Sequence, residues 1–532
     1  MPAPPDDMSS HDSVRESYDR IPYRTGSQSQ THPDRLATIA FLAGLSPAPP
    51  SRCRVLELGC ATGGNVIPMA FELRESTFIG VDLSPVQIER GREEIAVLGL
   101  DNIELHAKSI LDLGSELGVF DYIVCHGVFS WVPAEVREKI LDVCRDHLAP
   151  DGVAYISYNT YPGWFQRRML REMLLFHTRN VDDPEARAAQ SFELVDFLAD
   201  AVADATETHA VYLRAAREHL DDYRDQPSYL LHEYLEETNA PIYFTDMVAA
   251  ASQRGLRYLD DAEPHEMELD NLAPAVADRL RAFSANAIEQ QQYLDFVANR
   301  TFRRSLFALA PEAPSVDRHA RIATMHVASA SKPVSEVPEL RGGASESFRT
   351  EKGKPFSSDH PVAKATLVAL AAAWPRAVAF GALLDDVTTR LTRAGVPMDA
   401  GAILPDLVDA LFRSGVVELH IEPPPCANTV SSRPRASALA RRQASQGLLV
   451  TSQRRRVLKL DDPMARFLLL QLDGTQDRAA LVRLLDREVS AGRLDVRDGD
   501  APITRPERIP AVLEAIVEHH LRRMAQLALL VE

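Results

Sequence analysis

The feature that most constrains the fold is a glycine-rich turn between an apolar run and an amphipathic one. Residues 55–65 read Val-Leu-Glu-Leu-Gly-Cys-Ala-Thr-Gly-Gly-Asn. The first four residues form a short and mostly apolar run that fits a buried strand, and the residues after the turn have the periodicity of a helix. Glycines at such a turn let a ligand come close to the backbone. This order is typical of a binding turn at the carboxyl edge of a parallel sheet.

The same alternation continues along the chain. Further strands are expected at 78–83, 102–106, 120–125 and 153–158, with helices at about 64–74, 85–98 and 133–148. Strands that alternate with helices predict an α/β, Rossmann-like domain with a parallel sheet covered on both faces. A later run at 256–259 is expected to return to that sheet, so that the helices between 164 and 240 form an insertion over its carboxyl edge.

Two acidic residues specify the ligand of the turn. The glycine spacing, with Gly59 followed by Gly63 and Gly64, departs from the dinucleotide fingerprint, and Glu57 lies inside the strand end. A pyrophosphate needs bare N–H groups and no nearby carboxylate, whereas S-adenosylmethionine (SAM) carries an ammonium and a sulfonium. Asp82 ends the second strand, where a carboxylate accepts hydrogen bonds from both ribose hydroxyls. The combination indicates SAM as the cofactor; a generic nucleotide-binding domain or a core without ligand are the alternatives.

Several other positions are expected to contact the cofactor. Ser109 and Ile110 follow the third strand, where the adenine would lie. Trp131 either covers the adenine or packs against a helix start, and Tyr23 either closes over SAM or packs in a surface turn. The predicted cofactor-binding residues are Glu57, Gly59, Gly63, Asn65, Asp82, Leu83, Ser109, Ile110, Trp131 and Tyr23.

Two residues are candidates for the chemistry itself. His126 follows the fourth strand and either lines a transfer channel or bonds to nearby backbone. Tyr161 follows the fifth strand together with Tyr158 and Trp164. Aromatic faces attract cations, so these three rings form either a channel for a cationic group or an apolar cap. His126 and Tyr161 are the predicted catalytic residues, and no metal ligand set is expected.

Composition narrows the class of partner. The chain of 532 residues has a formal net charge of −18, which disfavours non-specific binding to nucleic acid or anionic membrane. No apolar run is long and uncharged enough for a membrane span, and residues 1–7 lack the features of a secretory signal, so a cytoplasmic location is expected. Five widely spaced cysteines favour neither a disulfide framework nor a zinc site.

The pattern along the whole chain predicts four parts. They are a SAM-binding domain at 1–175, a helical regulatory or lid domain at 176–305 in which 256–261 adds a strand, a linker at 306–357 rich in Pro, Ser, Ala and Gly, and a winged-helix-like domain at 358–532. Residues 433–459 contain eight basic residues and no acidic one. This basic run is expected to contact the acidic remainder of the protein; binding to nucleic acid or an acidic partner is the alternative.

Many of these segments also occur together in one family. The chain resembles bacterial methyltransferases with a methyltransferase regulatory domain, a group that includes the protein-lysine methyltransferases of outer-membrane proteins. The resemblance rests on residues 18–23, 30–36, 126–133, 157–164, 232–235, 293–296 and 299–303, besides the glycine turn. It implies a class I SAM methyltransferase fold, a helical middle domain, a winged-helix-like C-terminal domain and lysine side chains as substrate. One departure is Ser109, where the family tends to have aspartate.

Three functions follow from these observations. The first is methyl transfer from SAM to the side-chain nitrogen of protein lysines. The second keeps the fold but takes a small molecule or lipid as acceptor, with the helical middle as a lid. The third is a non-catalytic SAM-sensing regulator that binds nucleic acid, which the net charge of −18 disfavours.

Overall fold

The structure, a computed structural model, describes residues 26–309, 316–350, 355–495, 497–498, 501–502 and 509–531. Tyr23, a predicted cofactor contact, therefore lies outside the described residues. Among the described residues, no helix is long and apolar enough to cross a membrane. The cytoplasmic location stays a prediction. All five cysteines are buried and free of disulfides.

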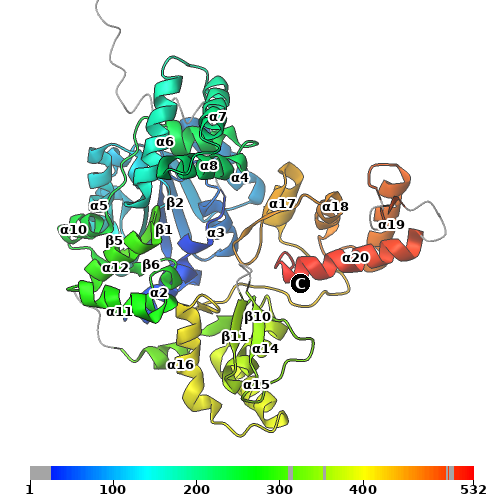
Figure 1. Cartoon of the computed structure of the whole chain (residues 1–532). Coiled ribbons are helices and arrows are strands. Elements are labelled where there is room, and N and C mark those ends of the chain that lie inside the picture. Colours follow the sequence, from blue (N-terminus) through cyan, green and yellow to red (C-terminus); the bar gives the residue numbers. More distant parts are fainter. Residues whose placement is uncertain are drawn as a thin grey trace, which may run out of the picture.

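A seven-stranded sheet with the order β3-β2-β1-β4-β5-β7-β6 forms the centre of the first domain (Figure 1). Strands β1 to β5 run parallel to one another, whereas β7 is antiparallel to both β5 and β6. The bounds are β1 Arg54–Leu58, β2 Thr77–Asp82, β3 Ile103–Ala107, β4 Phe120–Cys125, β5 Leu148–Asn159, β6 Arg257–Asp261 and β7 Phe302–Ala308. The predicted Rossmann-like sheet is confirmed, and the carboxyl ends of its parallel strands share one edge.

Helices cover both faces of the sheet, as predicted. One face packs on α2 Pro33–Leu42, α3 Val66–Glu72 and α4 Pro85–Leu98, and the other on α5 Ala134–His147 and α10 Phe244–Ser252. Local signals fix the helix bounds. In α4, for example, the Ser84 hydroxyl accepts a hydrogen bond from the backbone N–H of Gln87, and Gly99 ends the helix in the left-handed conformation.

The helices expected over the carboxyl edge form a separate layer. They are α6 Gly163–Thr178, α7 Pro184–Ala201, α8 Thr208–Asp221 and α9 Pro227–Leu230, followed by one π-helical turn, Leu231–Leu235. These elements share their own apolar core and lie beside the strand ends of the sheet (Figure 1). We call residues 163–235 the insertion.

The prediction of a linker at 306–357 is wrong for its described parts, 306–309, 316–350 and 355–357; residues 310–315 and 351–354 lie outside the described residues. Strand β7 inserts between β5 and β6, with Leu306, Phe307 and Ala308 buried. Later in the segment, β8 His326–Ala328 pairs with both β12 Val378–Ala379 and β13 Glu418–His420. Strands β9 Lys332–Pro333, β10 Glu346–Arg349 and β11 Pro355–Ser358 form a small sheet of their own. Pro, Ser and Gly signal turns, but they do not exclude short strands between the turns.

The described residues between 358 and 531 fold as two units rather than one. The first contains α14 Pro361–Ala373, α15 Phe380–Arg393 and α16 Ala400–Arg413, and its core includes Leu42 of the catalytic domain. The second has a separate core and contains α17 Ala438–Gln446, β14 Leu449–Thr451, β15 Val457–Lys459, α18 Pro463–Gln471, α19 Arg478–Ser490 and α20 Ile509–Gln526. This division is hard to predict from the sequence, because the first unit completes its sheet with β8, which lies in the segment expected to be a linker.

The basic run contacts the acidic remainder, as expected. At the β14–β15 turn, Arg455 forms ion pairs with Asp34 at 3.2 Å and with Glu72 at 2.9 Å. Arg454 and Arg456 both pair with Glu418. These contacts join the last unit to the catalytic domain and to the unit between them.

Candidate active site

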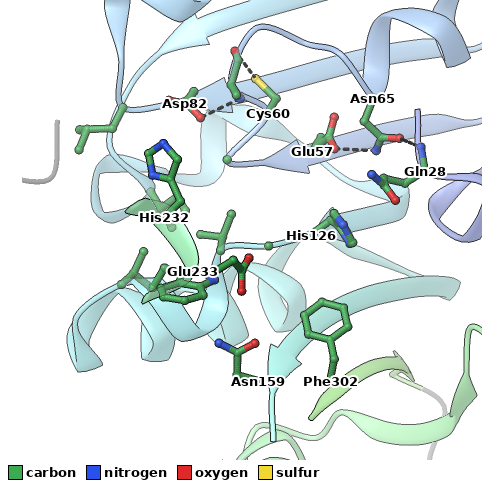
Figure 2. Close-up of a pocket in the computed structure, with 18 of the residues that line it drawn as sticks. Gln28, Glu57, Cys60, Asn65, Asp82, His126, Asn159, His232, Glu233 and Phe302 are labelled. Carbon is green, nitrogen blue, oxygen red and sulfur yellow. Dashed lines mark hydrogen bonds between the residues drawn. The ribbon is translucent and has the colours of Figure 1, made fainter. Parts of the chain in front are cut away.

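A cavity of about 720 Å³ lies between the carboxyl edge of the sheet and the insertion (Figure 2). Its volume is in the range of small-molecule sites. From the sheet side it is lined by Glu57, Gly59, Asn65, Asp82, Leu83, Ser109, Ile110, His126, Trp131 and Asn159, and from other segments by Gln28, Gln30, Arg167, Tyr223, Tyr229, His232, Glu233, Phe302 and Arg304, among others. Most of the predicted site residues therefore meet in one place.

The glycine turn forms one wall of the cavity. Gly59 has φ +72°, and a Cβ there would lie 2.3 Å from Cγ2 of Val128. Only glycine fits this close approach between the turn and the loop after β4. Gly63, also at positive φ, does not line the cavity, because its Cα faces the Ile67 side chain. Gly63 shapes the turn, and its predicted contact with the cofactor stays a prediction.

Glu57 is a buried carboxyl with one oxygen unsatisfied. Its Oε1 accepts a hydrogen bond of 2.7 Å from Nδ2 of Asn65, whose Oδ1 accepts one of 2.8 Å from the backbone N–H of Gln28. Oε2 is buried and has no hydrogen-bond partner among the described residues. Burial, with the nearby charge of Asp82, raises the pKa of Glu57 to about 8. A cationic group fits an orphaned carboxyl oxygen of this kind.

This shift predicts that cation binding is coupled to proton release. The free protein holds Glu57 mostly protonated below about pH 8, and a cationic ligand favours the ionised form. SAM affinity should therefore rise between about pH 6 and pH 8, with release of a proton on binding. Calorimetry in two buffers of different ionisation enthalpy measures that proton. Equal binding enthalpies in the two buffers would contradict the assignment, and Glu57→Gln should remove the pH dependence.

The unliganded protein should show the opposite trend in stability. Because the pKa of Glu57 is raised from 4.5 to about 8 by folding, the folded state binds more protons than the unfolded state in that interval. The contribution of Glu57 to the free energy of unfolding is therefore lost as the pH rises from about 4.5 to about 8.

Asp82 is held at the end of β2 by the backbone. Its Oδ2 accepts a hydrogen bond of 2.8 Å from the N–H of Ala61, and its Oδ1 accepts one of 2.9 Å from the N–H of Ser84. A carboxylate oxygen accepts more than one hydrogen bond, so both can still receive ribose hydroxyls. Ser109 and Ile110 line the cavity further along this edge, and the Ser109 hydroxyl caps its own turn by accepting from the N–H of Leu111 at 3.2 Å.

His126 and Trp131 both line the cavity. His126 Nδ1 lies 2.9 Å from the Tyr155 hydroxyl, which leaves Nε2 as its other polar atom. Burial, with the charge of Arg304, lowers the pKa of His126 to about 4, so the ring is neutral near pH 7. Trp131 packs edge-to-face on Trp164 with ring centroids 6.1 Å apart, so it packs against a helix start and faces the cavity as well.

Of the two alternatives for the aromatic rings after β5, the packing fits an apolar cap better than a channel into the cavity. Tyr161 lies at the turn into α6, and its ring stacks on Phe165 at a centroid distance of 4.2 Å, so it does not line the cavity. Tyr158 is buried with its hydroxyl 2.9 Å from that of Ser305, and Trp164 is buried in the cap. Tyr161 therefore does not line this cavity, and its predicted catalytic role finds no support in the arrangement of the site.

Other cavity residues were missed because they come from distant segments. Tyr223 and Tyr229, with stacked rings 3.6 Å apart, and Glu233 come from the insertion, whereas Phe302 and Arg304 come from β7. Residues 232–235 and 299–303 contribute to the family resemblance of the sequence. Nothing in their local pattern indicated that they meet at the sheet edge.

Matches to known families agree with this arrangement. Residues 56–154 match the methyltransferase domain, residues 226–308 the predicted methyltransferase regulatory domain, and residues 432–529 the C-terminal winged helix domain of PKMT. The winged helix is thus the second of the two C-terminal units. The sheet, the glycine turn and the two acidic residues define a class I SAM-dependent methyltransferase, with SAM as its cofactor.

Two of three similar proteins cover nearly the whole chain, and the third covers just under half of it. Uncharacterized protein RP789 of Rickettsia prowazekii is 31% identical over 97% of this chain and 93% of its own length. Uncharacterized protein RP028 of the same organism is 42% identical over 46% of this chain and 96% of its own length. The structure of PKMT2 from Rickettsia typhi in complex with AdoHcy is 29% identical, with a TM-score of 0.86, and covers 96% of this chain and 100% of that chain. The chain belongs to this family of methyltransferases with a regulatory domain and a PKMT-type winged helix.

Proposed function

We propose that this protein transfers the methyl group of SAM to the side-chain nitrogen of lysines in protein acceptors. The observation that carries the proposal is the full-length similarity to PKMT2, whose name denotes a protein-lysine methyltransferase, at a TM-score of 0.86. That relative binds AdoHcy, the product that SAM becomes after methyl transfer. The carboxyl groups of Glu57, Asp82 and Glu233 support the proposal, because SAM and lysine both carry cationic groups. Arg167 and Arg304 line the same cavity, so its lining is mixed in charge.

The residues of the sheet edge would hold the cofactor. Asp82 would receive the ribose hydroxyls, and Ser109 with Ile110 would lie beside the adenine. Glu57, oriented by Asn65, would face the ammonium of the methionine part. When bound, SAM supplies an electrophilic methyl group to an attacking nitrogen.

The remaining task of the protein is to present a neutral amine in line with that methyl group. A lysine has a solution pKa near 10.4, so it must lose a proton before it attacks. Desolvation in the cavity and the charge of the sulfonium lower that pKa. Much of the acceleration then comes from holding the amine in the correct orientation.

Incubation with methyl-labelled SAM and a lysate of its own host tests the proposal. Label in protein bands, lost with Asp82→Ala, is the expected result. Label in an organic extract would favour a small-molecule or lipid acceptor. SAM binding without any transfer would favour a sensing regulator. Either of these last two results would contradict the proposal.

A further inference from the structure

One acidic residue faces the cavity from the side opposite to the sheet. Glu233 lies in the π-helical turn Leu231–Leu235 that ends the insertion. Single π-helical turns occur frequently at functional sites. The turn is held by a contact of 2.7 Å between His232 Nδ1 and Glu236 Oε1, and by Arg171, which donates to the backbone carbonyls of Glu236 and Glu237. Glu233 is thus on a fixed support.

The carboxylate of Glu233 has no partner of its own. Among the described residues it forms neither a hydrogen bond nor an ion pair, although the adjacent His232 is paired with Glu236. Burial raises the pKa of Glu233, with the charge of Arg167 opposing that shift. Keeping an unpaired carboxyl partly buried in a cavity costs free energy. Charged groups that lie unpaired in a cleft are candidates for ligand contact.

The surroundings of Glu233 suit a long side chain with a cationic end. The stacked rings of Tyr223 and Tyr229 and the ring of Phe302 line the same cavity, and aromatic faces attract cations. The amide of Asn159, which is 3% exposed, lies at the end of β5. In Figure 2, Glu233, Asn159 and Phe302 lie together, with Glu57 and Asp82 across the cavity from them.

We propose that Glu233 receives the ammonium of the acceptor lysine and removes its proton. This inference rests on the proposed function. The ammonium passes one proton to the carboxylate, and the nitrogen lone pair then forms the N–C bond while the bond between methyl carbon and sulfur breaks. The sulfur keeps that electron pair and becomes neutral, the nitrogen carries the positive charge of the methylated ammonium, and Glu233 returns its proton to solvent after product release.

This placement explains why the cavity contains three carboxyl groups. Glu57 and Asp82, on the sheet edge, serve the cofactor, and Glu233, on the insertion, serves the acceptor. Binding from opposite sides brings the amine to the methyl group from the side away from the sheet-bound part of SAM. The insertion is thereby a part of the acceptor site rather than only a cover.

Glu233→Gln tests this role, with Glu218→Gln, an exposed residue of α8, as the matched control. The acceptors are the proteins of the host lysate, and methyl-lysine is counted after acid hydrolysis. Near neutral pH, Glu233→Gln should lower the rate by about a hundredfold or more, the usual effect of losing a general base. Glu218→Gln should not change it. The SAM dissociation constant should stay within about twofold of the unsubstituted value in both variants, since neither residue is assigned to the cofactor.

The pH profile separates a proton-accepting role from a structural one. As the pH approaches about 10, near the solution pKa of lysine, the amine is deprotonated without help. The deficit of Glu233→Gln should then shrink markedly. A rate equal to that of the unsubstituted protein, or the same proportional deficit at every pH, would overturn the inference alone. If the unsubstituted protein forms no methyl-lysine, the proposed function fails and this inference with it.

Discussion

Asp82→Ala is expected to weaken SAM binding by roughly tenfold to a hundredfold, because charge-assisted hydrogen bonds to the ribose contribute about 1.5–3 kcal/mol. Asp82 lies at the carboxyl end of β2 and lines the cavity. Its carboxylate also accepts from the N–H groups of Ala61 and Ser84, so its loss loosens the glycine turn as well. Calorimetry with purified protein measures the affinity.

Two further variants separate charge from fold. Asp82→Asn keeps the size and one acceptor oxygen, so it should bind SAM with an affinity between those of the alanine variant and the unsubstituted protein. Asp101→Ala removes an exposed carboxylate just before β3, away from the cavity, and should leave affinity unchanged. An unaltered dissociation constant in a folded Asp82→Ala protein would place the ribose elsewhere.

Arg455→Met is expected to destabilise the protein strongly. The guanidinium is nearly buried and pairs with Asp34 at 3.2 Å and with Glu72 at 2.9 Å. Removing one member of a buried ion pair costs about 3–5 kcal/mol when the partner charge is left uncompensated. Asp34 keeps its contact with His420 at 2.8 Å, whereas Glu72 loses its guanidinium partner. The Ser27 hydroxyl also donates to the carbonyl of Arg455 at 3.3 Å. Gln28, the residue after Ser27, lines the cavity, so the loss of Arg455 also affects the site. Thermal unfolding should show a midpoint lower by several degrees, and SAM affinity should fall modestly.

A double variant shows whether the loss comes from the charges. Glu72→Gln removes one of the two negative partners, so Arg455→Met combined with Glu72→Gln should lose less stability than the sum of the single changes. Arg522→Ala, which breaks an exposed pair with Glu518 on α20, should leave the midpoint unchanged. If Arg455→Met unfolds at the same temperature as the unsubstituted protein, the β14–β15 turn does not hold the domains together.

Local sequence determines which of the predicted residues come together at the cavity. A strand, a glycine turn and a helix lie within a few residues, so Glu57, Gly59 and Asn65 meet whatever the rest of the chain does. Asp82 follows from the same logic, since neighbouring parallel strands end at one edge. Gly63 shows the limit of such inference, because its contact with Ile67 depends on how the next helix packs.

The cavity residues that the sequence does not predict are placed there by contacts between segments far apart in the chain. Phe302 and Arg304 reach the cavity only because β7 inserts between β5 and β6, a pairing that local pattern does not encode. Glu233 depends on the packing of the whole insertion. Tyr161 is close to the site along the chain, yet the direction of its ring is set by contacts with Phe165 and Tyr243. Sequence proximity was therefore a poor guide to side-chain direction.

The most direct measurement is the identity of the methylated atom. Acceptor protein labelled by the purified enzyme and SAM is digested, and the modified peptides are sequenced by mass spectrometry. We expect the added methyl groups on the side-chain nitrogen of lysine, in amounts that fall with both Asp82→Ala and Glu233→Gln. Methyl groups on carboxylates, arginines or histidines, or no protein methylation at all, would contradict lysine methylation as the function of this protein.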